Sequence, residues 1–276
     1  MASTAGRTSS RVRTERQEVS LSDFQAEVFR LAPDAESHNW LIYGDSNVGK
    51  TVFAGTCPGK TFWLVCEPGY KSAARHNAAG HGRIIADTAT AWAAITWLNE
   101  RDRYRKIDWL ILDGLSTMQD RFRLGYAAEA FDIDPSKRQH RNLPDRPDYF
   151  NTQNFLKSWI PALVDMPVNL LITAHAYRTD NTEDGELLVF PGIQGKVTET
   201  ANAISGLMDI TGYMTARRMP VRGSDETRLV RRIYFESPPA QKGEAEARYI
   251  CGEKYGVLGP YMGAPTVPKL LERIAA

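Results

Sequence analysis

The stretch from Gly44 to Thr51 has the residue types and spacing of a loop that binds phosphate groups. It reads Gly44, Asp45, Ser46, Asn47, Val48, Gly49, Lys50, Thr51 and fits the pattern G-x-x-x-x-G-K-[ST]. Glycines let the backbone fold around an anion, so that successive N–H groups point at it. Lys50 is expected to reach the β- and γ-phosphates of a nucleotide, and the Thr51 hydroxyl to complete the shell of a bound Mg²⁺. The sequence therefore predicts a nucleotide-binding loop.

Two carboxylates follow apolar runs further along the chain. Asp113 ends the run 109–113 and is the candidate to hold the metal ion together with Thr51. The next residue is Gly114, so no glutamate stands directly beside Asp113 to activate water. Glu67 ends the run TFWLVCE and is predicted to emerge at the same edge of a parallel sheet, where it could orient the attacking water. No N-K-x-D motif for guanine is present, which favours ATP over GTP.

These residues need a sheet to bring them together, and the pattern predicts one. The sequence predicts strands over 39–44, 61–67, 108–118 and 168–176, with helices over 89–102 and 155–166 and a short helical stretch near 197–205. Continuous apolar strands are typical of a parallel sheet that is covered on both faces. The fold class is therefore α/β, a three-layer and mostly parallel sheet. Residues 119–150 lack periodicity, and Pro161 is expected to kink or end its helix early.

The expected domain organisation has three parts. Residues 1–36 form a flexible arm with a short helix, 37–215 the core, and 216–276 a β-hairpin with a tail packed on the core. The hairpin is predicted from the stretches DITGYMTARR and LVRRIYFESP. The first 20 residues are rich in Arg and Ser, which we interpret as a solvated arm and not as a transit peptide.

Composition excludes several classes of protein. The chain has 276 residues and a net charge of +1, so any nucleic-acid surface must be local. Its three cysteines form no C-x-x-C pair, which argues against a disulfide framework or a zinc site and favours a reducing compartment. No apolar run approaches the roughly 20 residues that a membrane-spanning helix requires. We expect a cytoplasmic protein without a membrane partner.

The glycine loop, the strand ending in Glu67, the later strand LILD and the strand LLITAHA resemble the RecA-type ATPases. The likeness covers residues 37–215 and is greatest to the compact phage RecA-like proteins of the single-strand-annealing group. It implies a RecA-type core that uses ATP and Mg²⁺. It also implies a polar residue on the LLITAHA strand that senses the γ-phosphate; His175 matches this position, and Thr173 is the alternative.

The resemblance further implies single-stranded DNA as a partner, bound by two loops. Basic side chains neutralise DNA phosphates, and aromatic side chains stack on bases. The second loop, 178–195, begins with Arg178 but is acidic. The residues of the first loop are Lys137, Arg138, His140, Arg141 and Arg146, followed by Tyr149 and Phe150.

Relatives of this type act as homo-oligomeric rings or filaments in which a basic residue completes the neighbour's ATP site. The resemblance assigns that role to Lys196, with Arg178, Arg217 and Arg218 as alternatives. Lys50, Glu67, His175 and Lys196 are thus the expected catalytic residues. The segment around Phe24 is expected to dock on a neighbouring subunit or on its own core. A phage origin, which follows only from the resemblance, makes the compartment the host cytoplasm.

The leading functional hypothesis is a DNA-dependent ATPase that promotes annealing or strand exchange in phage homologous recombination. One alternative is a hexameric ring motor of the helicase type, although no separate translocating module is visible. Another is a nucleotide-switched scaffold or regulator, which the near-neutral charge and the acidic second loop keep open. A small-molecule kinase fits less well, because its arginine-rich lid is not found near the phosphate loop.

Overall fold

A computed structural model describes residues 37–77, 80–180, 186–195, 198–221, 223, 226–240 and 246–276. The predicted N-terminal arm with its short helix lies outside these residues, as does Lys196. Residues Glu36 to Ala276 form one compact unit. Within the described ranges, no helix combines the length and the apolar character needed to cross a membrane.

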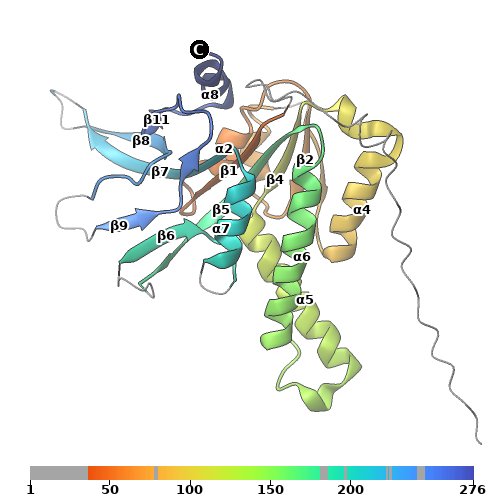
Figure 1. Ribbon diagram of the computed structural model, residues 1–276. Coiled ribbons are helices and arrows are strands. Elements are labelled where there is room, and N and C mark those ends of the chain that lie inside the picture. The colour runs from red at the N-terminus through yellow and green to blue at the C-terminus, as the bar shows by residue number, and fades with distance from the viewer. Residues whose placement is uncertain are drawn as a thin grey trace, which may run out of the picture. The chain divides into compact units, whose positions relative to one another are not determined.

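The centre of this unit is a parallel β-sheet (Figure 1). Its strands lie side by side in the order β7-β1-β5-β4-β2-β3, and each neighbouring pair is parallel. The strand that precedes the phosphate loop, β1, is thus separated from the strand that carries Asp113, β4, by the intervening β5. The bounds are β1 (Asn39–Gly44), β2 (Thr61–Val65), β3 (His81–Ile84), β4 (Trp109–Asp113), β5 (Asn169–Thr179) and β7 (Ile210–Pro220).

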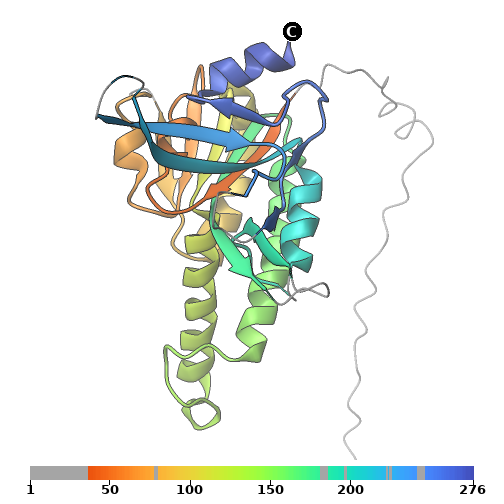
Figure 2. The ribbon, with the colours of Figure 1, turned by 90° about the vertical axis from the view of Figure 1, so that its left-hand side faces the viewer.

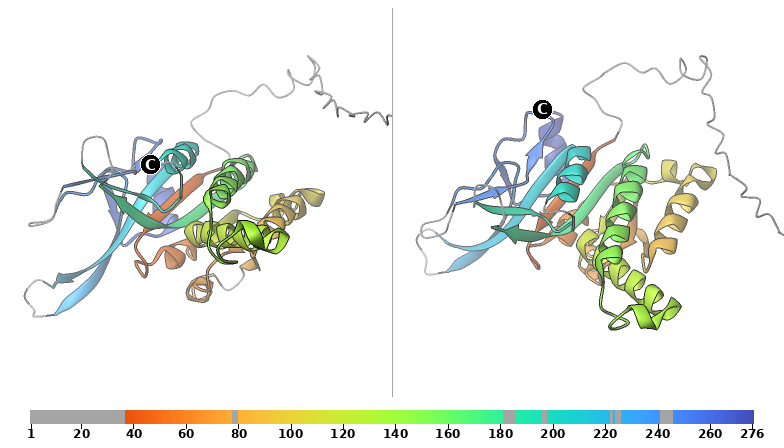
Figure 3. Two further views of the ribbon diagram at one scale, coloured as in Figure 1. Left: turned by 90° about the horizontal axis from the view of Figure 1, so that it is seen from below. Right: turned by 60° about the horizontal axis from the view of Figure 1, so that its bottom comes forward.

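Helices cover both faces of the sheet (Figure 3). Because side chains alternate along a strand, Leu41 and Tyr43 of β1 enter the apolar cluster with α4 to α7, whereas Trp40 and Ile42 enter the cluster with α2, α3 and α8. This three-layer α/β arrangement with a mostly parallel sheet confirms the predicted fold class. The helices are α2 (Lys50–Ala54), α3 (Tyr70–Ala73), α4 (Thr88–Asn99), α5 (Leu115–Ile133), α6 (Arg146–Val164), α7 (Glu199–Leu207) and α8 (Val267–Ile274).

The predicted C-terminal β-hairpin is present and extends the same sheet. Strand β8 (Thr227–Tyr234) pairs antiparallel with β7, and β11 (Tyr261–Gly263) pairs antiparallel with β8. The short β10 (Gly252–Glu253) pairs with β7 as well. Residue 215, the predicted end of the core, lies inside β7, where Thr215 pairs with Arg232. The hairpin is therefore continuous with the central sheet.

A second, smaller sheet forms where a polar loop was predicted. The last part of β5 pairs antiparallel with β6 (Leu187–Pro191), and β6 pairs parallel with β9 (Ala247–Tyr249). The prediction of a continuous loop from Arg178 to Gly195 was therefore wrong. Its described residues include the end of β5 and all of β6, because Val189 pairs with Arg178 of β5 on one side and with Tyr249 of the distant β9 on the other.

The largest difference from the sequence-based expectation is a helical hairpin. The strand predicted over 108–118 ends at Asp113, and α5 begins at Leu115; a short 3-10 turn, Pro135–Lys137, then leads towards α6. Figure 2 shows α5 and α6 extending together beyond the sheet. The buried residues of α5 are confined to its first thirteen positions, up to Ala127, so its outer part has no apolar stripe to reveal a helix.

Two helix ends also differ from the expectation. Helix α6 continues through Pro161 to Val164, so the predicted early break is absent. Helix α4 ends at Asn99, short of residue 102, and a 3-10 segment, Glu100–Lys106, follows it.

Candidate nucleotide-binding site

The strand register brings the predicted residues to one edge of the sheet. Gly44 lies beside His175, and Asp113 lies beside Thr173 on one side and Val65 on the other. The chain leaves β2 after Val65 and reaches Glu67 two residues later. A cleft of about 550 Å³ opens at this edge, where ligands bind in parallel α/β sheets. The described residues that line it include Lys50, Thr51, Glu67, Thr173 and His175.

The phosphate loop turns through two residues with left-handed backbone, Asn47 (φ 64°) and Gly49 (φ 106°). Lys50, the first residue of α2, is buried, and its Nζ donates hydrogen bonds to the carbonyl oxygens of Gly44 (2.9 Å) and Asp45 (2.8 Å). Burial lowers the pKa of Lys50, and the neighbouring carboxylates, Glu67 foremost, oppose that effect. The loop therefore holds the Lys50 ammonium group in place at the start of α2.

Thr51 and Asp113 meet directly. The Thr51 hydroxyl donates to the Asp113 carboxylate, at 3.0 Å from Oδ1 and 3.2 Å from Oδ2. Asp113 is only 1% exposed, and burial raises its pKa, while hydrogen bonds from Thr173 and Thr51 act against this rise. Mg²⁺ prefers oxygen ligands and is usually held by one or two protein groups plus phosphates and waters. The hydroxyl and the carboxylate at this point fit that ion.

Glu67 forms a hydrogen-bonded cluster with Thr117 and His175. Its Oε1 accepts from the Thr117 hydroxyl at 2.6 Å and lies 3.1 Å from His175 Nε2. The hydrogen bond to His175 is the main reason that the pKa of Glu67 is lowered, and the bond from Thr117 adds to it. Glu67 is therefore a carboxylate at neutral pH, as a residue that accepts a proton from water must be.

The two candidates for the γ-phosphate sensor have different partners. The Thr173 hydroxyl donates to Asp113 Oδ1 at 2.7 Å and accepts from the Gly114 backbone N–H at 2.9 Å. His175, two residues further along β5, reaches Glu67 instead. The Thr173 hydroxyl is thus bonded to Asp113, whereas the His175 ring lies beside Glu67.

Gly114 explains why no glutamate follows Asp113. Its φ of 98° is left-handed, and a Cβ placed there would lie 2.6 Å from the Glu67 Cγ. Any side chain at position 114 would be strained and would collide with Glu67. The carboxylate that lines the cleft at this point is Glu67, which follows β2.

Apart from Arg178, the predicted DNA residues lie away from the cleft. Lys137, Arg138 and Arg141 lie in or just after the 3-10 turn between α5 and α6, and each forms an ion pair there. Arg138 donates twice to Asp148, at 2.6 and 3.0 Å, and Arg141 donates twice to Asp132, at 2.9 and 2.8 Å. These arginines hold the hairpin together as well as presenting charge.

Arg178 and Arg146 have contrasting surroundings. Arg178, near the end of β5, donates through both amino groups to the carboxylate of Asp45 in the phosphate loop, each at 2.9 Å. Arg146 is the first residue of α6 and is exposed. The structure therefore brings one of the two to the edge of the nucleotide site and leaves the other on the hairpin.

Three further residues at the site were missed from the sequence. Thr117 lies in the first turn of α5 and would have been expected near Asp113 had that helix been recognised. Gln119, fully buried, donates to the carbonyl of Gly192 and accepts from the N–H of Gln194, both at 2.8 Å, and so fixes the segment leading to Lys196. Arg231 of β8 donates from Nε to the carbonyl of Val48 at 3.1 Å, across 183 residues of sequence. No local sequence pattern indicates this contact between Arg231 and Val48.

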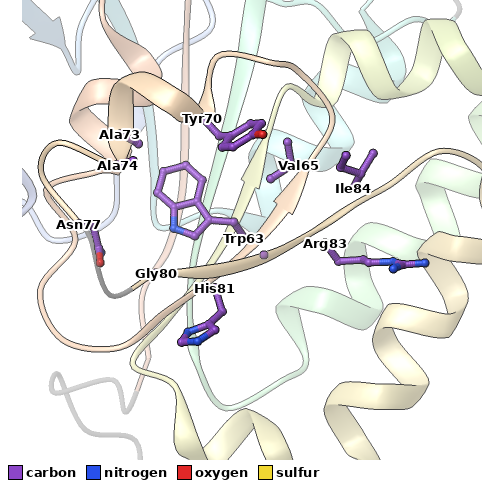
Figure 4. Close-up of a pocket in the computed structure, with 11 residues that line it drawn as sticks. Trp63, Val65, Tyr70, Ala73, Ala74, Asn77, Gly80, His81, Arg83 and Ile84 are labelled. Atoms are coloured by element: carbon purple, nitrogen blue, oxygen red, sulfur yellow. The ribbon is translucent and has the colours of Figure 1, made fainter.

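A second recess, of about 310 Å³, lies at the edge strand β3. Figure 4 shows Trp63 and Tyr70 at its centre and Arg83 and Ile84 beside them. Its described lining residues include no carboxylate and no serine, threonine or cysteine. We therefore assign the chemistry to the cleft at the phosphate loop.

A phosphate loop after β1, with a threonine and an aspartate that meet beside it, defines the class of P-loop ATPases. Comparison with known proteins agrees. Residues 37–243 match the family described as "AAA domain", and the chain belongs to that family. No curated protein shows significant sequence similarity to the chain.

Among solved structures, the chain is similar to the KaiC-like protein PH0186 from the hyperthermophilic archaeon Pyrococcus horikoshii OT3. The identity is 10%, the match covers 72% of this chain and 78% of that one, and the TM-score is 0.39.

Proposed function

We propose that this chain binds and hydrolyses ATP in the cleft at the phosphate loop and couples hydrolysis to the binding of single-stranded DNA. In this proposal it acts as a homo-oligomer that promotes annealing or strand exchange in phage homologous recombination. The observation that carries the ATPase part is the cluster in which Thr51 meets Asp113 while Glu67 is held by Thr117 and His175.

Each residue has a defined task in hydrolysis. Lys50 and the loop N–H groups bind the phosphates, and Thr51 and Asp113 would hold Mg²⁺, which would supply positive charge to the phosphate oxygens. Glu67 orients the attacking water and accepts its proton, because its lowered pKa keeps it ionised. Thr117 fixes one oxygen of Glu67, and His175 connects that carboxylate to the phosphate it is expected to sense.

The DNA part is supported by one face of α6. Tyr149 and Phe150 lie three and four residues after Arg146, which places both of them beside Arg146 on the surface of the helix. Phe150 is 62% exposed and Tyr149 is 40% exposed. An exposed guanidinium beside exposed aromatic rings is the combination that contacts a DNA phosphate and stacks on bases without sequence preference.

A second candidate, the nucleotide-switched scaffold, is favoured by the ion pairs of Arg138, Arg141 and Arg178. Each of these guanidinium groups is already paired with an aspartate of the same chain, so less charge is available for DNA. In that case the exposed face of α6 would contact a protein partner.

The deciding experiment measures ATP hydrolysis with and without single-stranded DNA. We expect stimulation by DNA in the wild type, and loss of hydrolysis in Lys50→Ala and Glu67→Gln. Glu67→Gln should still bind ATP, because it removes the base and leaves the phosphate contacts. Hydrolysis that ignores DNA, together with no DNA binding by the wild type, would support the scaffold instead.

The DNA surface is tested by the double variant Arg146→Ala/Phe150→Ala. Loss of a stacked aromatic and a phosphate contact should weaken DNA binding by roughly tenfold or more. Lys106→Ala, an exposed basic residue of the 3-10 segment, is the control and should bind as the wild type does. Unchanged affinity in the double variant would refute this surface.

The role of Lys196 belongs to the oligomer. Mixing Lys196→Ala subunits with Lys50→Ala subunits should restore part of the hydrolysis if Lys196 completes a neighbour's site, since a mixed interface can then hold one intact set of residues. No restoration at any ratio would argue against Lys196 and direct attention to Arg217 and Arg218.

A further inference from the structure

Arg231 of the C-terminal hairpin lines the nucleotide cleft. It lies at the middle of β8, opposite Ala216 of β7, and its backbone carbonyl accepts a hydrogen bond from Ala264 on the other side. Strands on both sides therefore fix the position from which its side chain reaches the phosphate loop. There its Nε donates to the Val48 carbonyl at 3.1 Å.

The contact with the loop is close. A Cβ on Gly49 would lie 2.7 Å from Arg231 Nε and 3.1 Å from its Cδ. Gly49 has a left-handed φ of 106°, which favours glycine, and a side chain at this position would also displace Arg231. Arg231 packs directly against the turn that leads into Lys50 and Thr51.

The terminal amino groups of Arg231 have unused hydrogen-bonding capacity. Arginine carries five N–H donors, and the Val48 carbonyl is the only acceptor that Arg231 reaches among the described residues. Other half-buried arginines are better satisfied. Arg138 has Asp148, Arg123 has Asp120 together with the Tyr149 ring, and Arg121 donates to the carbonyls of Ile85 and Cys66.

A half-buried cation whose N–H donors lack acceptors is unfavourable unless an anion is present. In the part of the chain that the structure describes, no aspartate or glutamate oxygen forms an ion pair with Arg231. A second basic side chain, Lys50, lines the same cleft. Guanidinium groups bind phosphate oxygens with two parallel hydrogen bonds. The unused N–H donors of Arg231 could therefore bind the phosphate oxygens of a nucleotide.

We infer that Arg231 binds a phosphate group of the nucleotide within its own chain, so that the C-terminal hairpin forms part of the ATP site. This rests on the proposed ATP-binding function of the cleft. It differs from the role proposed for Lys196, which acts on a neighbouring subunit. It also makes β8 responsive to nucleotide, because the same side chain touches the loop and the ligand.

The test is the affinity for ATP with Mg²⁺, measured by calorimetry on the full chain, together with melting temperatures with and without ATP. Arg231→Ala should weaken ATP binding by about tenfold or more, the usual effect of losing a charged hydrogen bond. Arg231→Lys should recover part of the affinity, because it restores the charge. The control Arg228→Ala, an exposed arginine on the same strand, should match the wild type.

Two readouts separate ligand binding from a purely structural role. In Arg231→Ala the rise in melting temperature caused by ATP should shrink, while the melting temperature without nucleotide stays near that of the wild type. Wild-type affinity in Arg231→Ala would overturn the inference. A lower melting temperature of Arg231→Ala without nucleotide would also overturn it, if that loss of stability accounts for the whole loss of affinity and Arg231→Lys does not restore it.

Mixing subunits tests whether the contact is made within one chain. Mixtures of Arg231→Ala and Lys50→Ala should show no recovery of hydrolysis, whereas recovery would show that Arg231 serves a neighbour and would overturn the assignment. Absence of ATP binding in the wild type would instead refute the proposed function, a result distinct from failure at Arg231 alone.

Discussion

Asp113 and Glu67 are two carboxylates of one cleft whose surroundings act in opposite directions. Burial raises the pKa of Asp113, whereas hydrogen bonds from His175 and Thr117 lower the pKa of Glu67. Such a separation of environments assigns different tasks to chemically similar groups. Asp113 is suited to binding a cation, which would replace its lost hydration. Glu67 is suited to remaining an ionised carboxylate that contacts water.

The first prediction concerns Asp113. Because its folded pKa lies above its unfolded value, its contribution to stability is full at acidic pH and is lost as pH rises through the folded pKa. Asp113→Asn keeps the oxygen that accepts from Thr51 and Thr173, and removes the buried charge. Without nucleotide, it should therefore melt higher than the wild type at pH 8, with the gap closing near pH 4, although hydrolysis is lost. Equal destabilisation by Asp113→Asn at both pH values would contradict this account.

The second prediction concerns Gly114. Gly114→Ala forces a Cβ into left-handed backbone and against Glu67, so stability should fall by about 1–2 kcal/mol. Displacement of the water-orienting carboxylate should reduce kcat by up to roughly 100-fold. Gly125→Ala is the matched control, because Gly125 lies within α5 with open space around it. It should raise stability by about 0.5–1 kcal/mol and leave kcat unchanged.

At the scale of elements, α5 joins the ATP cleft to two other parts of the molecule. Its first turn supplies Ser116, which accepts from the His175 N–H, and Thr117, which holds Glu67. One turn later, Gln119 fixes the segment after β6. Its outer half forms the hairpin with α6 (Figure 2). A change at the cleft therefore has a continuous helix through which to reach the hairpin.

The third prediction compares the two arginine pairs of that hairpin. Asp148 is 1% exposed and also closes the capping box at the start of α6, so Arg138→Ala leaves a buried carboxylate without its partner. The side chains of Arg141 and Asp132 are each more than half exposed, and such pairs contribute little. Arg138→Ala should lower the melting temperature by several degrees, and Arg141→Ala should barely change it. Equal effects of the two variants would show that Asp148 does not depend on Arg138.

At the scale of the whole molecule, the C-terminal segment closes the layer that contains the phosphate loop. Val267 and Leu270 of α8 are fully buried in the cluster that holds Phe53 of α2, and the Val267 N–H donates to the Thr56 hydroxyl at 2.8 Å. The end of the chain thus supports the helix that begins at Lys50.

The fourth prediction follows from that contact. Leu270→Ala should lower the free energy of unfolding by about 2–5 kcal/mol, since it leaves a cavity in this cluster. The exposed neighbour Glu272 is the control, and Glu272→Ala should stay within about 0.5 kcal/mol of the wild type. Urea denaturation measures both. If Leu270→Ala lowered the free energy of unfolding by less than about 0.5 kcal/mol, α8 would not be packed as described.

The sequence alone determined the parts of this protein whose chemistry is contained in contiguous residues. The phosphate loop could be read from Gly44 to Thr51, because each residue there has a task set by its own type and position. The apolar runs ending at Asp113 and Glu67 revealed strands of a parallel sheet, since only doubly covered strands are apolar throughout. The hairpin of β7 and β8 was likewise visible as two alternating runs.

Only the tertiary structure decided which residues are partners. The helical hairpin escaped detection because its outer part contacts no layer and so lacks an apolar stripe. Arg138, Arg141 and Arg178 gave no sign in sequence that each would meet an aspartate. The separate contacts of Thr173 and His175 depend on the register of β5 between β1 and β4. Arg231 reaches the phosphate loop because β8 joins the sheet beside β7, and such long-range pairing is not recorded in any local pattern.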